Sequence, residues 1–186
     1  MTNLLPITAL GASAPPSQQF GVHTMRENNG LALVSLAVVR GTPPPTPFGL
    51  TLPAAGNCAM QDDYTAFWTS PDQWIITAEN LGETDFAATV QNEVPNARLT
   101  EQTDGWVAFE ITAETDDQIG AVLTRVANLP QSDVAVGKAV RTGFDHMTIF
   151  LVRRSENQVT VMVMRTLAVT LWHALEIILQ RLEVQK

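Results

Sequence analysis

The sequence has little of what disulfide frameworks and metal sites are built from. It contains one cysteine, Cys58, and three histidines among 186 residues. A lone cysteine excludes an intrachain disulfide and is typical of a reducing compartment. His23, His146 and His173 lie far apart, without metal-ligand spacing to one another, to Cys58 or to a carboxylate pair. We therefore expect no metal in this chain.

Basic residues are also scarce. The chain has 11 Lys and Arg against 19 Asp and Glu, which gives a formal net charge of −8. Nucleic acids require clustered Lys and Arg, and the basic residues here are scattered, so we expect no nucleic-acid partner. Charged residues make up only 16% of the chain, which is below the usual ~25%. This shortage indicates that some apolar surface is covered by a partner rather than by water.

Long apolar runs and catalytic motifs are missing as well. No stretch approaches the ~20 apolar residues of a membrane span, and the N-terminus lacks the basic region of a signal peptide. We expect a cytoplasmic protein without membrane contact. There is no Gly-x-Gly-x-x-Gly, no phosphate-binding lysine loop and no Gly-x-Ser-x-Gly. Cys58 lies near Asp62 and Asp63, which disfavours a reactive thiolate. We predict no catalytic residue, although a composite Ser/His/Asp site stays open at this level.

The strongest local pattern that is present covers residues 67–76, Phe-Trp-Thr-Ser-Pro-Asp-Gln-Trp-Ile-Ile. Pro71 suits the second position of a type I turn because its ring pre-sets φ, and Asp72 suits the position after it. Apolar, β-favouring residues flank the turn, so we predict a hairpin of residues 64–68 and 73–78. Core or cross-strand packing is the favoured role of Trp68 and Trp74.

Strands and helices alternate from residue 31 onward. Residues 31–39 predict an interior strand, and a proline-rich loop follows and extends to residue 63. Asp104-Gly105 predicts a tight hairpin turn between strands 97–103 and 106–112. Further strands are predicted at 139–142, 147–152 and 158–164, and helices at about 84–94, 114–128 and 166–182.

Residues 1–30 lack this periodicity and are rich in Ala, Pro, Ser, Gln and Asn. We expect an extended N-terminal arm that either lies along a partner or wraps its own domain. Residues 31–186 are expected to form a single domain, which could divide into two intertwined subdomains.

A weak internal repeat indicates the fold class. The order strand, turn, strand, helix occurs at residues 64–94 and again at 147–182, with another strand–helix pair between them. Hairpins that are each followed by a crossing helix predict an α+β fold with mainly antiparallel sheet and packed helices, ferredoxin-like in character.

The last predicted helix is apolar around most of its circumference. One stripe at helical spacing is joined by apolar residues outside it: Leu167, Leu171, Leu175, Ile178 and Leu182 in the stripe, and Val169, Trp172, Ile177 and Leu179 beside it. Such a helix is either buried in a large core or covered by another chain. In a chain of this size we favour partial coverage by a partner.

Read in order, several of these stretches resemble the gamma subunit of heterotetrameric sarcosine oxidase. The most specific is Trp68-x-Ser-Pro71-Asp72-Gln73-Trp74. Two weaker ones are Glu-Gln-Thr-Asp-Gly at 101–105 and the segment 164–172, which contains Arg165, Leu171 and Trp172. Glu101, Trp106 and Thr166 depart from the residues usual in the family, which leaves packing and turns as their expected roles.

This resemblance implies a fold like the folate-binding domain of the glycine-cleavage T-protein. It also implies a complex with alpha, beta and delta subunits that oxidatively demethylates sarcosine to glycine, with formaldehyde or methylene-tetrahydrofolate and hydrogen peroxide as the other products. FAD, FMN, NAD and tetrahydrofolate would belong to the large subunits and zinc to the smallest, and none to this chain. The residues singled out become candidate structural or interface residues rather than catalytic ones: Trp68, Pro71, Asp72, Gln73, Trp74, Arg165, Leu171 and Trp172.

The leading hypothesis is therefore a non-catalytic accessory subunit of such a complex. The alternative is a free-standing tetrahydrofolate-binding protein of T-protein-like fold. An independent small hydrolase has almost no support in the sequence.

Overall fold

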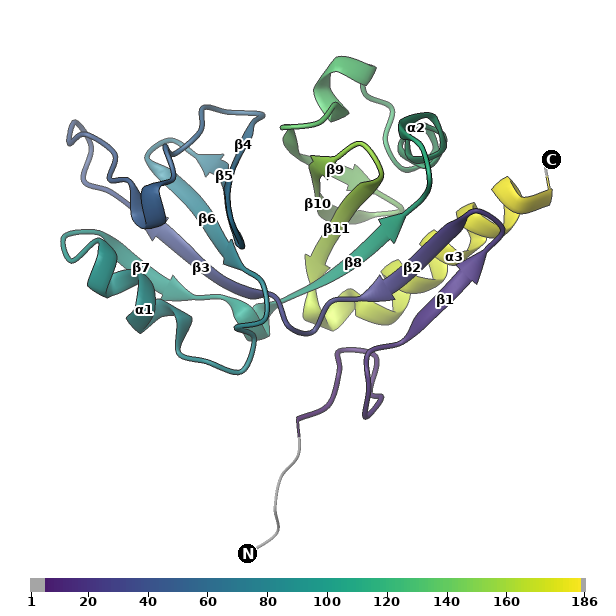
Figure 1. The fold of residues 1–186 in the computed structure, drawn as a ribbon, viewed down its shortest axis with the longest axis horizontal. Helices are drawn as coiled ribbons and strands as arrows, with labels where there is room; N and C mark the ends of the chain where they lie inside the picture. The colour runs from purple at the N-terminus through teal and green to yellow at the C-terminus, as the bar shows by residue number, and fades with distance from the viewer. Residues whose placement is uncertain (1–5, 185–186) are drawn as a thin grey trace, which may run out of the picture.

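The protein, described for residues 6–184 by a computed structural model, is built from two antiparallel sheets and three α-helices (Figure 1). One sheet has six strands in the order β1-β2-β8-β11-β10-β9, and the other has five in the order β4-β5-β6-β3-β7. This architecture confirms the predicted α+β fold with mainly antiparallel sheet. The strands are β1 Ser17–Phe20, β2 His23–Glu27, β3 Ala32–Ala37, β4 Cys58–Gln61, β5 Tyr64–Ser70, β6 Gln73–Ala78, β7 Arg98–Glu101, β8 Trp106–Thr112, β9 Ala139–Phe144, β10 Met147–Ser155 and β11 Gln158–Met164. The helices are α1 Phe86–Glu93, α2 Asp116–Val126 and α3 Ala168–Val184, and the 3-10 turns are η1 Pro47–Gly49, η2 Thr103–Gly105, η3 Gln131–Val134 and η4 Arg165–Leu167.

Both sheets contain the same four-strand unit. In the five-stranded sheet, β4, β5 and β6 form a meander, β6 returns to pair with β3, and α1 follows. In the six-stranded sheet, β9, β10 and β11 form the meander, β11 pairs with β8, and α3 follows. The predicted strand–turn–strand–helix repeat is therefore the second half of a longer repeat, and we call its two copies the five-stranded half and the six-stranded half.

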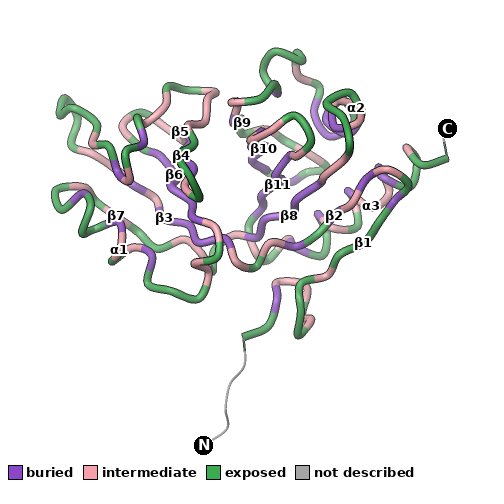
Figure 2. Tube along the Cα trace, in the orientation of Figure 1, coloured by how far each residue is buried: buried purple, intermediate pink, exposed green. Residues whose placement is uncertain are grey.

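The two sheets face each other, and the helices cover their outer faces. Buried residues of both sheets meet between them, including Leu33 and Phe67 on one side and Phe150 and Met162 on the other. The rings of Phe67 and Phe150 lie 5.3 Å apart across this contact. α1 packs on the outer face of the five-stranded sheet, and α2 and α3 pack on the outer face of the six-stranded sheet. Figure 2 shows the buried residues concentrated on the strands where the halves meet. Strands buried on both faces explain why β3 and β8 are apolar throughout most of their length.

Backbone hydrogen bonds also join the halves at the start of the two meanders. The amide of Cys58 donates to the carbonyl of Gly137 at 2.9 Å, and the amide of Ala139 donates to the carbonyl of Gly56 at 3.2 Å. Both glycines have positive φ, 76° and 84°, a conformation that costs other residues more. The reciprocal pairing places the two copies of the repeat symmetrically about this contact.

Local sequence explains how the helices begin. Asp85 caps α1 by accepting a hydrogen bond from the Ala88 amide at 2.9 Å. Thr115 and Gln118 form a capping box at the start of α2. The apolar stripes of both helices then face their sheets. As the sequence spacing predicts, Phe86 and Val90 of α1 are fully buried.

Residues 17–27 of the expected N-terminal arm lie on the chain's own domain, the second of the two alternatives, but as a hairpin rather than an extended segment. β1 and β2 form a hairpin there, and β2 pairs with β8, so residues 17–27 extend the six-stranded sheet. Phe20 and Met25 are buried in the core beneath α2 and α3. The polar strand β1 has no apolar alternation because it is an edge strand with exposed side chains, and this hid the hairpin in the sequence.

The predicted hairpin at Asp104-Gly105 is wrong. Residues 98–101 pair with β3 in the five-stranded sheet, while β8 belongs to the six-stranded sheet. The intervening residues form η2, because the Glu101 carboxylate accepts from the amides of Gln102 and Thr103 and turns the chain away. The segment is thus a crossover between the two halves.

Two smaller predictions also need correction. Asp72 has φ of 60°, whereas a type I turn requires a negative φ of about −90° at that position. Aspartate tolerates this left-handed conformation better than most residues, so the turn has the positive φ of type II. The loop predicted up to residue 63 contains the short edge strand β4.

Among residues 6–184, no helix is long and apolar enough to cross a membrane.

Candidate functional site

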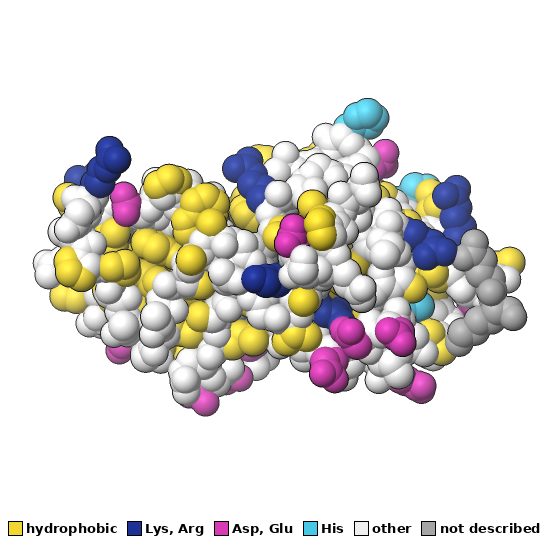
Figure 3. Space-filling model, turned by 90° about the horizontal axis from the view of Figure 1, so that it is seen from above, with side chains coloured by type: hydrophobic (Ala, Val, Ile, Leu, Met, Phe, Trp, Pro, Cys, Tyr) yellow, Lys and Arg dark blue, Asp and Glu magenta, His cyan; other side chains and the backbone are white. Residues whose placement is uncertain are grey.

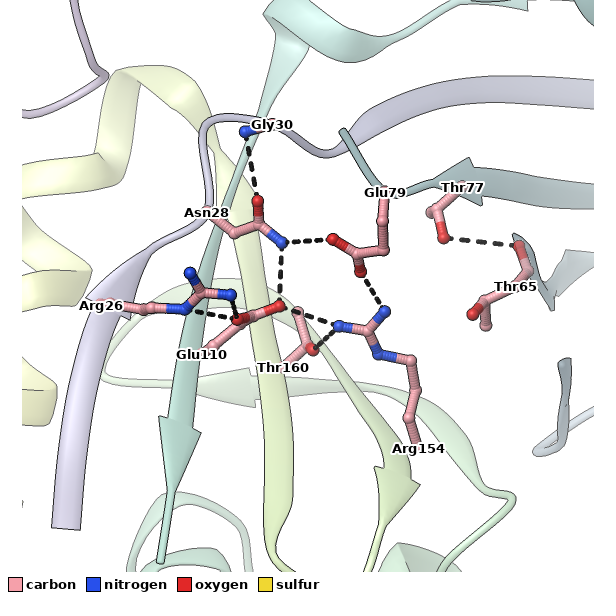
Figure 4. Close-up of polar contacts among 9 residues, drawn as sticks. All are labelled: Arg26, Asn28, Gly30, Thr65, Thr77, Glu79, Glu110, Arg154 and Thr160. Atoms are coloured by element: carbon pink, nitrogen blue, oxygen red, sulfur yellow. Dashed lines mark hydrogen bonds and ion pairs between the residues drawn. The ribbon is translucent and has the colours of Figure 1, made fainter. Parts of the chain in front are cut away.

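Charged side chains that the sequence places far apart meet between the halves (Figure 4). Glu110 of β8, only 2% exposed, accepts from Arg26 Nε at 2.8 Å and from Arg154 Nη2 at 2.9 Å. Asn28 donates to Glu110 at 2.8 Å and to Glu79 at 2.9 Å. Arg154 Nη1 forms an ion pair with Glu79. We call these five residues the junction network.

The junction network joins the two halves, and its positive and negative charges balance. Glu79 follows β6 of the five-stranded half, whereas Glu110 and Arg154 lie on β8 and β10 of the six-stranded half. Two carboxylates face two guanidinium groups, so the charges balance, with Glu110 buried and the Arg26 side chain 56% exposed. Satisfied networks of this kind fix the geometry of packed elements, while removing one member leaves a buried charge without its partner. The arrangement is suited to holding the sheets in register.

A hollow of about 550 Å³ opens beside this network, between the N-terminal segment, η2 and η4. We call it the junction hollow. It is lined by Pro6, Ile7, Thr8, Ser13, Glu27, Asn28, Asn29, Leu31, Leu33, Gly82, Glu83, Thr84, Thr103, Asp104, Trp106, Val107, Ala108 and Arg165. Its walls therefore come from both halves and are rich in hydroxyl, amide and carboxylate groups.

The N-terminal segment forms one wall of the hollow and is tied down by two side chains. Glu27, 2% exposed, accepts from the Ala9 amide at 2.6 Å. Arg165 Nη2 donates to the Ile7 carbonyl at 3.0 Å. These bonds give the buried Glu27 carboxylate a structural partner, and they place Arg165, one of the sequence-predicted interface residues, in the wall of the hollow.

The tryptophan hairpin lies away from the hollow. Trp74 is 6% exposed, and its indole Nε1 donates to the Pro53 carbonyl at 2.8 Å. Trp68 pairs with Trp74 across the strands, and it is half-buried. Pro71 and Gln73 are exposed in the turn. Packing of the two indoles follows the sequence interpretation, and the exposed turn residues remain candidates for an interface.

Leu171 and Trp172 on α3 differ in burial. Leu171 is fully buried in the core of the six-stranded half. Trp172 is half-buried and meets the Phe109 ring edge-on, with centroids 5.3 Å apart. The exposed side of α3 carries Val169 at 67% exposure together with polar residues, so α3 is less uniformly apolar in space than its sequence predicts.

A second buried guanidinium belongs to Arg153. Its Nη2 pairs with Asp116 and donates to the Glu156 carbonyl at 2.6 Å, while Nε and Nη1 have no hydrogen-bond partner. Both unpartnered nitrogens are enclosed by protein, so neither can reach a ligand in the neighbouring groove along α2. Burying two donors without acceptors lowers the stability of the fold, so Arg153 is a structural residue rather than a binding group.

The thiol and the histidines have structural surroundings. Burial raises the pKa of the Cys58 thiol to about 11, against the opposing effect of Arg154 and Lys138. His23 is buried and contacts the Gln118 carbonyl at 3.1 Å, and His173 is exposed beside Glu176. Within residues 6–184, no three His, Cys, Asp or Glu side chains are grouped to hold a metal ion.

Sequence reasoning missed the junction network. Its members span residues 26 to 154 and share no spacing. One signal was available: Glu110 interrupts the mostly apolar strand Trp106–Thr112, and Arg153 and Arg154 follow an apolar run on β10. A charge inside an apolar strand indicates a buried partner, although the sequence does not say which one.

Comparison with known proteins places the fold. No protein-family model matches the sequence, and no curated protein matches it in a sequence search. A chain of heterotetrameric sarcosine oxidase from Corynebacterium sp. U-96, solved with pyrrole 2-carboxylate, superposes with a TM-score of 0.72 at 18% identity, covering 89% of this chain and 88% of that chain. Glycine cleavage system aminomethyltransferase T from Bartonella henselae superposes with a TM-score of 0.56 at 13% identity, covering 80% of this chain and 44% of that one. The chain thus has the fold of that sarcosine oxidase chain and of the matched part of aminomethyltransferase T, and the resemblance seen in the sequence is confirmed at the level of fold.

Proposed function

We propose that the chain is a non-catalytic accessory subunit, of the gamma type, of a heterotetrameric sarcosine oxidase. The observation that carries this proposal is the likeness to a chain of that enzyme over 89% of one chain and 88% of the other. Such nearly equal shares mean that the two chains have similar lengths, so the likeness concerns a whole subunit. With aminomethyltransferase T, in contrast, the match covers 44% of the other chain and so concerns one part of it. The order of motifs around Pro71 and Trp74 supports the same assignment.

The engagement of the ionisable side chains supports a structural role for this chain. Glu79, Glu110 and Arg154 are committed to the junction network, and Glu27 holds the N-terminal segment. At neutral pH the Cys58 thiol stays protonated because burial raises its pKa to about 11. A general base or nucleophile acts through a carboxylate that is not held in place by ion pairs or amides, or through a thiolate, and these groups offer neither.

In this proposal the complex oxidatively demethylates sarcosine to glycine in the cytoplasm. In this proposal its large subunits bind FAD, FMN, NAD and tetrahydrofolate, its smallest subunit binds zinc, and this chain packs against them. The proposed role is therefore assembly and the shaping of a subunit surface, with the chemistry carried out elsewhere in the complex.

Co-expression with the other three chains tests the proposal. We expect all four to copurify in equal amounts, with flavin absorbance in the peak that contains this chain. The matched control replaces this chain with the corresponding fragment of aminomethyltransferase T, which has the same fold and should stay outside the complex. A flavin-containing complex that forms without this chain, while the free chain elutes alone, would refute the proposal.

A free-standing tetrahydrofolate-binding protein is the second candidate. It is favoured by the likeness to aminomethyltransferase T and by the junction hollow, whose volume of about 550 Å³ lies within the range of small-molecule sites. Calorimetric titration of the isolated chain with tetrahydrofolate separates the two candidates. Saturable binding would support this second function, and a flat titration would eliminate it.

A further inference from the structure

One exposed apolar side chain, Ile7, lines the junction hollow, and two more lie close in sequence to Arg165 in its wall. Ile7 is 63% exposed and Met164 is 54% exposed. The two are joined through Arg165, which follows Met164 in the chain and donates to the Ile7 carbonyl. Val169, 67% exposed, lies four residues beyond Arg165, where η4 runs into α3. We call Ile7, Met164 and Val169 the apolar rim.

Inside the hollow the ionisable side chains are mainly acidic. Glu27, Glu83 and Asp104 line it, and Arg165 is its basic residue. Glu83 and Asp104 are exposed and make no ion pair within residues 6–184. Arg165 already donates to the Ile7 carbonyl. The hollow therefore favours a cation and repels an anion.

The neutral polar groups of the lining also suit a cationic side chain. The hydroxyls of Thr84 and Thr103 and the side chain of Asn29 can accept hydrogen bonds, and they lie in the walls together with the carboxylates. A guanidinium group has five N–H donors and no acceptor, so it needs a wall of acceptors. At about 550 Å³ the hollow has room for one long side chain and the backbone that carries it.

We propose that the junction hollow receives an Arg or Lys side chain of a partner subunit, while apolar residues beside that side chain pack on the apolar rim. An acidic hollow with exposed apolar side chains near one of its walls is complementary to a basic residue flanked by apolar ones, and such complementarity sets register and specificity between subunits. The inference rests on the proposed function only in identifying the partner as another subunit of the complex.

Charge variants test the acidic interior in the complete complex. Glu83→Lys with Asp104→Lys should weaken incorporation of the chain about tenfold or more, measured by native mass spectrometry of the co-expressed subunits at graded expression. Glu83→Gln with Asp104→Asn should weaken it less and should reduce its dependence on salt. The matched control, Asp63→Lys with Glu183→Lys, changes exposed acids outside the hollow and should leave incorporation within about twofold. Equal incorporation of both lysine pairs, or equal loss, would overturn the proposal.

Apolar variants test the rim in the same assay. Met164→Asp and Val169→Asp should each reduce incorporation, since they place a charge against an apolar contact. Val39→Asp is the control because Val39 is 55% exposed but lies beside the proline-rich loop of the other half. Loss with Val39→Asp and none with the rim variants would move the interface to that loop and reject the rim.

The isolated chain separates this inference from the proposed function. If the wild-type chain does not assemble with the other subunits, the proposed function fails and the hollow is tested with acetyl-Leu-Arg-Leu amide as the probe. Saturable shifts of the Trp106 indole signal in NMR, lost in Glu83→Gln with Asp104→Asn and absent with acetyl-Leu-Glu-Leu amide, would support the hollow as a site for basic segments. Equal shifts with both peptides, or none with either, would reject it.

Discussion

The five-stranded and six-stranded halves share the order of a four-strand unit but connect its strands differently. In the six-stranded half, the connection from β8 to β9 contains the helix α2, which helps α3 cover the sheet. In the five-stranded half, the connection from β3 to β4 contains the prolines of residues 43–47 and no α-helix. Proline lacks the N–H that a helix needs and its ring clashes with the preceding turn, so a helix is excluded there. The pairing of the strands is therefore the same in this unit of both halves. The connections differ only in whether they add an α-helix to the outer face of the sheet.

The hydrophobic cores between each sheet and its covering helices differ in size, as the different connections lead one to expect. Within residues 6–184, the core beneath α2 and α3 has 22 buried residues, and the core beneath α1 has 11. The surface differs too. Residues 41–61 contain no Asp, Glu, Lys or Arg, and Figure 3 shows hydrophobic side chains gathered over the five-stranded half and acidic ones over part of the six-stranded half. We therefore expect the five-stranded half to depend more heavily on a few large side chains.

Trp74 tests that dependence most directly. Trp74→Ala should lower the free energy of unfolding by about 3–5 kcal/mol, because it empties a large buried site and leaves the Pro53 carbonyl without its donor. The position after the turn in the six-stranded half is Val159, and Val159→Ala should cost about 2 kcal/mol because less volume is lost. Urea unfolding measures both. Equal effects would contradict the unequal dependence of the halves.

The junction network tests how firmly the halves are joined. Glu110→Ala should destabilise the protein by about 3 kcal/mol, because it removes a buried carboxylate and leaves the partly buried Arg154 with one partner fewer. Glu79→Ala should lower the free energy of unfolding by less, since Arg154 keeps its ion pair with Glu110. Chemical denaturation followed by both tryptophan fluorescence and circular dichroism measures the effect. Transitions that separate by probe in Glu110→Ala but coincide in the wild type would show that the network couples the halves, whereas a change near zero would count against that role.

The helix caps provide a smaller comparison. Thr115→Ala removes the capping box of α2 and should cost about 1–2 kcal/mol, and Asp85→Ala should cost about 1 kcal/mol at α1. Thr115→Asn keeps a capping acceptor and serves as the control. Thermal unfolding of the three variants gives the ranking, and an unaltered Thr115→Ala would show that packing alone holds α2.

Cys58 lies where the six-stranded half has Ala139, and it makes the five-stranded half sensitive to alkaline pH. Burial raises the pKa of its thiol from 9.0 to about 11. The unfolded chain thus loses this proton first as pH rises, so the stability contribution is complete below pH 9 and is lost as pH rises through 11. Alkylation by iodoacetamide should be slow at pH 8 in the folded protein and fast in urea. Equal rates in the two conditions would contradict the burial of the thiol, and Cys58→Ala should abolish the extra pH dependence.

Arg153 should show the smallest effect. Arg153→Met removes a buried guanidinium with two unpartnered nitrogens and leaves Asp116, whose side chain is 54% exposed, in contact with water. We expect the free energy of unfolding to change by less than about 1 kcal/mol, or to rise, because an apolar side chain carries no unmet hydrogen bonds. A loss comparable to that of Glu110→Ala would show that Arg153 holds β10 to α2 more strongly than its contacts indicate.

Prediction from sequence succeeded where neighbouring residues decide the structure. β11 was predicted with its observed bounds, and α1 and α2 lie within the predicted ranges 84–94 and 114–128. It failed at Asp104-Gly105, where the local turn signal was real but the strands on either side pair in different sheets. It also failed at β1, whose polar side chains give no alternation. Of the candidate site, Arg165 was identified, but its place in the wall of the junction hollow was not.

The sequence by itself determined the three helices, most of the strands with their approximate limits, the α+β class and the packing role of the two indoles in the hairpin. These follow from hydrogen bonds and apolar spacing within a few residues of each position. Only the tertiary structure decided that β7 and β8 separate, that residues 17–27 join the sheet, and that Arg26, Glu79, Glu110 and Arg154 meet. A carboxylate reveals in the sequence that it needs a partner, but which guanidinium it reaches depends on how two sheets stack, and no local pattern encodes that.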